Sequence, residues 1–247
     1  MVTKVSFEAI PHKPLVTSSN PVVATFCSTN IWRLLIVNLT EQLLGYALTY
    51  FDVAGVYHIS NIESALILGL ESTPKRNLDE FRKIDSKLYL AGFAEYVQPG
   101  LELMLNRLKE KGVAANVIGE YGYTLQGSTD FISYKQAAIK AGLGKRGKNT
   151  LVINPVFGSR LRFAALKLNT LLETTKDDPD QESPFCQACS ICIDECPVDV
   201  LEPCRMLDTT KCLSNIRGNV APIKDKQVVM CDICLKKCPA NYVGMKV

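Results

Sequence analysis

The residues of this sequence that are best suited to chemistry are its cysteines, nine of which lie between Cys186 and Cys238. The first run has the spacing C-x2-C-x2-C-x3-C-P and consists of Cys186, Cys189, Cys192, Cys196 and Pro197. This spacing is typical of bacterial ferredoxins, in which three cysteines hold one [4Fe–4S] cluster and the fourth ligates another. Two-residue gaps let a tight turn wrap three thiolates around one cluster, and the proline then directs the chain away from it. The run therefore predicts iron–sulfur clusters.

A second run, C-x2-C-x3-C-P, repeats this pattern without its first cysteine, because Val228 stands where that cysteine would be. If the fourth cysteine of each run crosses over, the first cluster has the ligands Cys186, Cys189, Cys192 and Cys238. The second cluster then has the three ligands Cys196, Cys231 and Cys234. Its fourth ligand must come from elsewhere, and the spacing allows either Cys204 or Cys212.

Two other uses of these cysteines compete with iron–sulfur clusters. C-x2-C pairs also form four-cysteine zinc sites, but zinc does not explain the third cysteine of the first run. Disulfides are not expected, because no secretory signal precedes the cysteines and a cytosolic thiol cluster is more often a metal site. We therefore expect a cytoplasmic metalloprotein.

The composition indicates a folded protein with a full-sized core and a small additional module, since 47% of the residues are hydrophobic and 21% are charged. The formal net charge of +3 does not by itself indicate nucleic-acid binding. The most apolar stretch, from Ile31 to Phe51, is interrupted by residues such as Arg33 and Glu41, so no membrane span is expected there. An amphipathic helix that begins near Thr40 is expected instead.

Alternating helical and strand-like patterns predict an α/β fold for the region before the cysteines. Helices are expected around 40–50, 101–111 and 133–141, and strands over 64–70, 113–118, 151–154 and 162–168. A charged linker with prolines, Thr174 to Pro184, follows. We therefore expect an α/β cofactor or substrate domain over 1–173 and a double [4Fe–4S] ferredoxin-like domain over 174–247.

A glycine-rich segment, Ala141 to Thr150, connects a predicted helix to a predicted strand. A dinucleotide fingerprint or a P-loop has the reverse order, with the strand first, so a nucleotide phosphate site is not indicated. Its three glycines indicate either a tight turn capped by Gly142 or the close approach of a large flat group. The residues alone leave both possibilities open.

Two segments resemble the epoxyqueuosine reductase family, which is related to the corrinoid-dependent reductive dehalogenases. They are A-G-L-G-x-x-G-K-N-T-L at 141–151 and M-C-D-x-C-x-x-x-C-P-x-N at 230–241. The resemblance covers about residues 60–241. It implies a nitroreductase-like α/β domain that binds cobalamin, joined to a C-terminal two-cluster ferredoxin-like module. It also implies that the clusters receive electrons from a low-potential donor of ferredoxin or flavodoxin type and pass them to the cobalt.

The resemblance assigns individual residues as well. At the corrinoid it places Gly142, Gly144, Gly147, Lys148 and Asn149, the last two as donors to propionamide or phosphate oxygens. In the family, the second cluster draws its fourth thiolate from a cysteine at the offset that separates Cys212 from Cys196. Cys212 is therefore the expected ligand, and Cys204 is spare.

Family members that act on tRNA carry an acid in a D-x-x-P-x-x-E stretch just before the glycine loop. Counting back from Gly142 places Ser128 at the aspartate and Tyr134 at the glutamate. The remaining candidates for a proton donor are Asp130 and Tyr96, and a donor must lie within hydrogen-bond reach of its target. The chain ends at Val247 without the helical-repeat tail of those members, so tRNA is not an expected partner.

Three functions are compatible with these patterns. The favoured one is an iron–sulfur oxidoreductase with two [4Fe–4S] clusters and a bound cobalamin, which reduces an unidentified substrate. The second is an electron-transfer protein that reductively activates a corrinoid protein or another redox partner without substrate chemistry of its own. The third is a structural zinc protein.

Overall fold

The computed structural model describes residues 21–84, 87–118, 133–176, 179–208, 211–212, 221–223, 226–228 and 231–242. Its helices are α1 (Pro21–Ala47), α2 (Ala91–Tyr96), α3 (Gln98–Glu110), α4 (Tyr134–Lys140), α5 (Ile191–Asp194) and α6 (Ile233–Lys236), with the 3-10 turns η1 (Pro184–Cys186) and η3 (Pro239–Tyr242). The longer strands are β1 (Val53–His58), β2 (Ser64–Glu71), β3 (Phe81–Ile84), β4 (Lys87–Leu90), β5 (Ala115–Val117) and β8 (Leu161–Leu168). Short strands are β6 (Lys145–Arg146), β7 (Val152–Ile153), β9 (Leu201–Glu202), β10 (Arg205–Met206), β11 (Ala221–Ile223) and β12 (Lys226–Val228).

Four strands form the central sheet in the order β1-β2-β8-β5, and every neighbouring pair is antiparallel. In the middle of β2, Leu66 lies opposite Val56 on one side and Leu166 on the other. Both β2 and β8 are buried over most of their length. Because successive side chains of a strand point to opposite faces, a strand that is covered on both faces is apolar at nearly every position. This explains the unbroken apolar run of β2.

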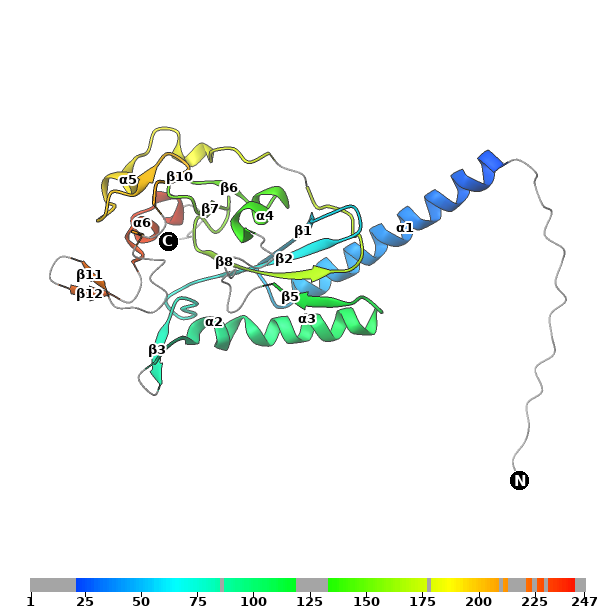
Figure 1. The fold of residues 1–247 in the computed structure, drawn as a ribbon, viewed down its shortest axis with the longest axis horizontal. Coiled ribbons are helices and arrows are strands. Elements are labelled where there is room, and N and C mark those ends of the chain that lie inside the picture. Colours follow the sequence, from blue (N-terminus) through cyan, green and yellow to red (C-terminus); the bar gives the residue numbers. More distant parts are fainter. Residues whose placement is uncertain are drawn as a thin grey trace, which may run out of the picture.

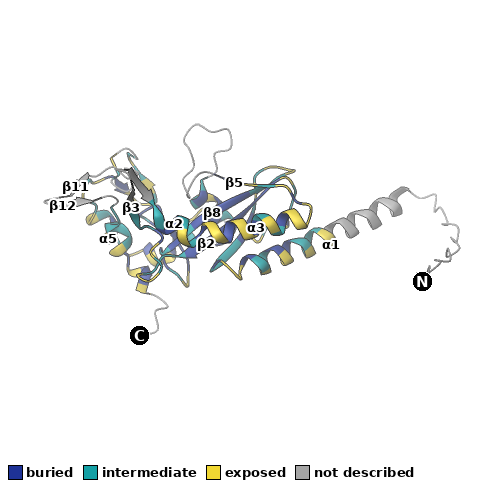
Figure 2. Ribbon diagram, turned by 90° about the horizontal axis from the view of Figure 1, so that it is seen from below, coloured by how far each residue is buried: buried dark blue, intermediate teal, exposed yellow. Residues whose placement is uncertain are grey.

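Helices cover both faces of the sheet (Figure 1). On one face, α1 and α3 bury Leu43, Met104 and Leu108 against the even-numbered leucines of β2. On the other face, α4 buries Ala138 and Ile139 against the odd-numbered residues of β2. Figure 2 shows that the buried residues concentrate in the sheet, whereas the outer side of α3 is exposed. The result is a three-layer arrangement in which each face of the sheet has its own hydrophobic core.

The predicted mixed α/β class is confirmed, and strands β2 and β8 and helices α3 and α4 lie where they were expected. Before the cysteines, helix α2 and strands β1, β3, β4 and β6 were not predicted, and helix α1 begins earlier than expected. Helix α1 begins at Pro21 rather than near Thr40, through a segment rich in valine, threonine and serine, which have low helix propensity. Strand β1 was not predicted, because Gly55 in its middle weakens the strand pattern. A Cβ at Gly55 would lie 3.1 Å from both Ala141 and Leu143, so the glycine permits the end of α4 to pack closely on β1.

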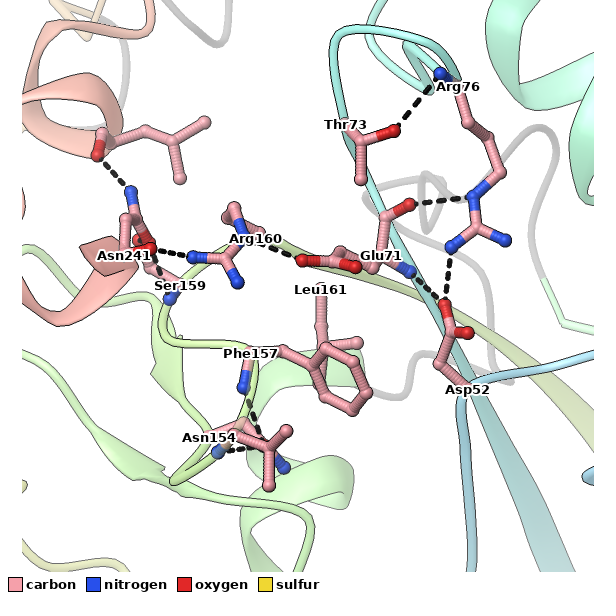
Figure 3. Close-up of polar contacts among 12 residues, drawn as sticks. Asp52, Glu71, Thr73, Arg76, Asn154, Phe157, Ser159, Arg160, Leu161 and Asn241 are labelled. Carbon is pink, nitrogen blue, oxygen red and sulfur yellow. Dashed lines mark hydrogen bonds and ion pairs between the residues drawn. The ribbon is translucent and has the colours of Figure 1, made fainter. Parts of the chain in front are cut away.

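The cysteine-rich segment is attached to the sheet through Asn241 (Figure 3). The buried side-chain oxygen of Asn241 accepts hydrogen bonds from the backbone N–H of Ser159 at 2.9 Å and from its hydroxyl at 2.8 Å. The side-chain nitrogen of Asn241 donates to the Leu235 carbonyl oxygen at 2.6 Å. Arg160 donates to the backbone carbonyl of Asn241 and pairs with Glu71 of β2 at 2.7 Å. Asn241, three residues after Cys238, therefore ties the end of the second cysteine run to the central sheet.

The segment between β8 and the cysteines is also held against the α/β part. The Thr175 hydroxyl accepts from the Val56 N–H at 3.1 Å and donates to the Ala141 carbonyl at 2.7 Å. Further along, the Ser183 N–H donates to the Arg146 carbonyl at 2.7 Å. The predicted linker is thus hydrogen-bonded at both ends, and the domain boundary at residue 173 stays a prediction. Within the part of the chain that the structure describes, no helix has both the length and the apolar character needed to cross a membrane.

Leu66→Ala should lower the free energy of unfolding by about 2–5 kcal/mol, because it leaves a cavity in a side-chain layer covered on every side. Leu66 is 0% exposed, whereas Leu48 is 54% exposed and provides the matched control. Leu48→Ala should change stability by less than about 0.5 kcal/mol. Denaturant unfolding of both variants measures the difference, and equal effects would contradict the described core.

Asn241→Ala should cost about 1–3 kcal/mol, because it leaves the Ser159 N–H and the Leu235 carbonyl without their described partner. Asn116→Ala, on the exposed part of β5, is the control and should have little effect. The same unfolding measurement serves for both. An Asn241 variant as stable as the Asn116 variant would show that this contact does not hold the two parts together.

Candidate functional site

Four cysteines line a single cavity of about 50 Å³ beside α4. They are Cys196, Cys212, Cys231 and Cys234. Most of the remaining wall is apolar and includes Leu151, Val200 and Leu201. The cavity thus brings together the same four cysteines that the spacing and the family resemblance predict for the second cluster, although that they hold a cluster stays a prediction.

The cysteines predicted for the first cluster are neighbours as well. Cys186 and Cys238 are buried in one small core with Ile153. Burial raises the pKa of the Cys192 thiol to about 11, and the negative charges of Cys186, Cys238 and Cys189 add to the effect. The Cys189 N–H donates to the Cys186 carbonyl at 3.0 Å, so the described contacts also place Cys189 beside Cys186.

The two cysteine runs fold as copies of one another. Cys192 is the second residue of α5 and Cys234 is the second residue of α6. Each run then ends in a turn in which the last cysteine donates its N–H to a carbonyl three residues earlier, Cys196 to Ile193 at 3.1 Å and Cys238 to Leu235 at 3.2 Å. A proline follows each of these cysteines and prevents the helix from continuing. The short helices therefore present their cysteines in equivalent positions.

Burial and mutual repulsion oppose the ionisation of these thiols. Burial raises the pKa of Cys234 to about 12, and the charges of Cys231, Cys212, Cys192 and Cys196 raise it further. Thiolates in such a group are stable only when a cation offsets their charge, and a metal-bound thiol is deprotonated outright. The donor set consequently suits a cationic iron–sulfide core.

Among the described residues, no group of three or more His, Cys, Asp or Glu side chains is placed as the ligands of a metal ion are. A [4Fe–4S] cube takes one thiolate at each of its four irons. None of the nine described cysteines forms a disulfide. The cavity with its four cysteines fits a cluster of this kind.

Cys204 lies apart from this cavity. Its backbone is in the left-handed region, with φ of 61°, and its thiol donates to the Glu182 carboxylate at 3.4 Å. Burial and then this hydrogen bond raise the pKa of Cys204 to about 11. Cys212 lines the cavity and Cys204 does not. The assignment of Cys212 as the fourth ligand stays a prediction.

The glycine loop is first of all a helix end and a tight turn. Gly142, with φ of 76°, follows α4, and its N–H donates to the Ile139 carbonyl while the Leu143 N–H donates to the Ala138 carbonyl. This is the hydrogen-bond pattern of a Schellman cap. Gly142 thus caps α4, one of the two roles that the residues alone left open, and its predicted role at a corrinoid stays a prediction.

The other two glycines permit close approach of the protein's own chain. A Cβ at Gly144 would lie 2.7 Å from the Ile153 carbonyl oxygen, because β6 pairs with β7 there. A Cβ at Gly147 would lie 2.7 Å from the side-chain oxygen of Asn149. A Cβ at either glycine would thus meet the chain itself, and the predicted role of Gly144 and Gly147 at a corrinoid stays a prediction.

Lys148 and Asn149 contact the cysteine-rich segment. The Lys148 ammonium lies 3.4 Å from the Gln187 carbonyl and 3.9 Å from Glu182. The Asn149 side chain donates to the Cys234 carbonyl at 3.2 Å and accepts from the Leu151 N–H at 3.1 Å. In the described contacts these two residues join the glycine loop to the cysteines, and their predicted role at a corrinoid stays a prediction.

Of the two predicted proton donors the structure describes Tyr96, which does not line the cysteine cavity. Tyr96 ends α2 and packs on the core shared with α1 and α3, on the face of the sheet opposite α4. Asp130 and Ser128 lie outside the described residues. Tyr134, at the position of the family's glutamate, is buried and donates to the Ile118 carbonyl, and burial raises its pKa to about 12.

Two residues of the site were not among the predicted site residues. Lys135 lines the cavity together with the four cysteines, and Asn241 docks the second run on the sheet. Lys135 is one of 28 lysines and arginines, and nothing in its neighbours distinguishes it. Asn241 belongs to the C-P-x-N ending that resembles the family, and that ending was the signal that could have found it.

No family model matches this sequence. Two similar curated proteins are both named epoxyqueuosine reductase. The one from Cyclobacterium marinum is 30% identical over 194 residues, which are 74% of this chain and 60% of that protein. The one from Leadbetterella byssophila is 30% identical over 192 residues, again 74% of this chain and 60% of the relative. The chain therefore spans about 60% of the length of these relatives.

Solved structures share the fold. A selenomethionine-labelled epoxyqueuosine reductase has a TM-score of 0.62 at 18% identity, over 84% of this chain and 66% of that one. A catabolic reductive dehalogenase has a TM-score of 0.57 at 14% identity, over 77% of this chain and 30% of that one. An epoxyqueuosine reductase solved with an epoxyqueuosine-modified stem loop of tRNA-Tyr has a TM-score of 0.60 at 18% identity, over 84% of this chain and 66% of that one.

The prediction that tRNA is not a partner is wrong. The similar curated proteins are named for epoxyqueuosine, and one structural neighbour holds a tRNA stem loop. The prediction depended on two points. Ser128, the first, lies outside the described residues. The end of the chain, the second, says nothing about the fold that this chain shares with that neighbour. The resemblance to the family itself is confirmed: in sequence and in fold, this chain is a homologue of the epoxyqueuosine reductases and shares its fold with reductive dehalogenases.

Proposed function

We propose that this protein is an iron–sulfur reductase that passes low-potential electrons from two [4Fe–4S] clusters to a bound cobalamin. The cavity beside α4, lined by four cysteines and otherwise mostly by apolar side chains, is the observation that supports this most directly. Apolar surroundings with few hydrogen bonds to sulfur keep the potential of such a cluster low. Cobalamin is included because the relatives are epoxyqueuosine reductases and a structural neighbour is described as carrying out B12-dependent dehalogenation.

The proposed substrate is epoxyqueuosine in tRNA, after the names of the similar proteins. Bound cobalamin would supply a low-valent cobalt for the reduction. The chain's own residues would hold the clusters: Cys186, Cys189, Cys192 and Cys238 the first, and Cys196, Cys212, Cys231 and Cys234 the second. The glycine loop supports the proposed position of the second cluster, because Asn149 donates to the carbonyl of Cys234. The corrinoid side is supported by the relatives.

The buried position of Tyr134 supports a second candidate function. This residue occupies the place of an acid in the tRNA-acting members, yet its hydroxyl is buried and donates to a backbone carbonyl. A phenol whose pKa is raised to about 12 is a poor proton donor near neutral pH. The alternative is an electron-transfer protein that reduces a corrinoid protein or another redox partner and does not act on a substrate itself.

The ligand assignment predicts different effects for two neighbouring cysteines. Cys212→Ser should reduce the iron content from about eight to about four atoms per chain, because one cluster loses a ligand. Cys204→Ser is the matched control and should leave the iron content unchanged. Iron and acid-labile sulfide analysis of anaerobically reconstituted protein measures both. The reverse result would assign the ligand to Cys204, and zinc without sulfide in the unaltered protein would exclude clusters altogether.

The reductase function predicts that reconstituted protein with cobalamin and a strong reductant consumes epoxyqueuosine in tRNA. Nucleoside analysis of digested tRNA by mass spectrometry measures the loss, with protein lacking cobalamin as the control. Turnover should fall at least tenfold in Cys212→Ser, because electrons must pass through the cluster that this variant lacks. A cobalamin absorption spectrum that does not change at saturating protein, together with no turnover, would favour the electron-transfer function.

A further inference from the structure

We propose that Lys135 makes the second cluster easier to reduce than the first, so that electrons move from the cluster of Cys186, Cys189, Cys192 and Cys238 to that of Cys196, Cys212, Cys231 and Cys234. This inference rests on the proposed function, because it requires that both clusters be present. It assigns a direction to electron flow through the cysteine-rich segment. Lys135 acts on the cluster through its charge and is a positioning residue rather than a catalytic one.

Lys135 lies in the wall of the cavity that the four cysteines share. Apart from the cysteines, it is the one ionisable residue among the described residues that line this cavity. Its ammonium donates a hydrogen bond to the Thr150 hydroxyl at 3.3 Å, and Thr150 lines the same cavity. The ammonium is therefore held beside the site by a described partner.

The backbone of Lys135 is held in place. Lys135 is the second residue of α4, and its neighbour Tyr134 is anchored by the hydrogen bond to the Ile118 carbonyl. Ala137 and Ala138 of the same helix are buried against the sheet. Burial lowers the pKa of Lys135, whereas the negative charges of Cys212 and Cys234 oppose that change. A cluster with four thiolate ligands carries a net negative charge and likewise favours the ammonium form.

Beside the first group of cysteines, a carboxylate and an ammonium offset one another. The carboxylate of Glu182 accepts the hydrogen bond of Cys204 and lies 3.9 Å from the ammonium of Lys148. The second cluster would thus face an ammonium whose described partner is a neutral hydroxyl, whereas the first would face an ion pair.

The step concerned is the uptake of one electron by an oxidised cluster from a low-potential donor of ferredoxin or flavodoxin type. No bond is made or broken, and the cluster becomes more negative by one charge while the donor becomes more positive by one. A nearby positive charge in a poorly solvated wall stabilises the reduced cluster more than the oxidised one. The reduction potential of the second cluster is raised accordingly, and an electron on the first cluster moves toward the second.

The test is a redox titration, followed by electron paramagnetic resonance, on the anaerobically reconstituted protein. Lys135→Met should make reduction of one cluster at least tenfold less favourable, a shift of about 59 mV for a one-electron couple. The signal of the other cluster should not move. Cys212→Ser, expected to keep only the first cluster, identifies which signal is which. Lys140→Met is the matched control, with no expected shift in either potential. Lys140 belongs to the same helix, and its ammonium lies over the Tyr57 ring, 5.8 Å from the ring centroid.

Lys135→Arg separates charge from shape, because it keeps the charge and should keep the potential. Loss of the second cluster in Lys135→Met and in Lys135→Gln, but not in Lys135→Arg, would also support a role for the charge. Unchanged potentials in Lys135→Met with both clusters present, or the same shift in Lys135→Arg, would overturn the inference. Unaltered protein without iron and sulfide would instead refute the proposed function, so the two failures are distinguishable.

Discussion

The concentration of thiols in a small volume is the constraint on which the rest of this structure depends. Burial and neighbouring thiolates raise the pKa of Cys234 to about 12 and that of Cys192 to about 11, so the protein by itself favours neutral thiols there. A cationic iron–sulfide core would reverse this preference. Because metal binding then contributes to folding free energy, stability of the cysteine-rich segment and loading of its clusters would be coupled.

The glycine loop connects the sheet to the cysteine-rich segment. Gly142 ends α4, and Gly144 lets β6 lie against β7. This places Asn149 where it reaches the Cys234 carbonyl. Together with Asn241, which bonds Ser159 just before β8, the junction holds the cavity against the helix that carries Lys135. The glycines are thus needed for a close approach within the protein.

The relationship to the epoxyqueuosine reductases places these features in a functional setting. The shared fold provides a sheet domain, and the cysteine-rich segment packs beside its α4 face. A protein that delivers electrons at low potential needs its clusters close to the site where they are used and shielded from water. The apolar wall of the cavity and the short, hydrogen-bonded connection through Thr175 and Ser183 are compatible with that requirement.

The sequence by itself determined the local features. The cysteine spacing predicted two groups of thiols, and the apolar runs predicted β2 and β8, because turns and strands depend on neighbouring residues. The family motifs identified the relatives. Only the tertiary structure decided that Cys212 rather than Cys204 lines the cavity and that Lys135 faces it. It also decided that the sheet is antiparallel in the order β1-β2-β8-β5. These outcomes depend on packing between segments far apart in the chain, which residue spacing alone did not decide at these positions.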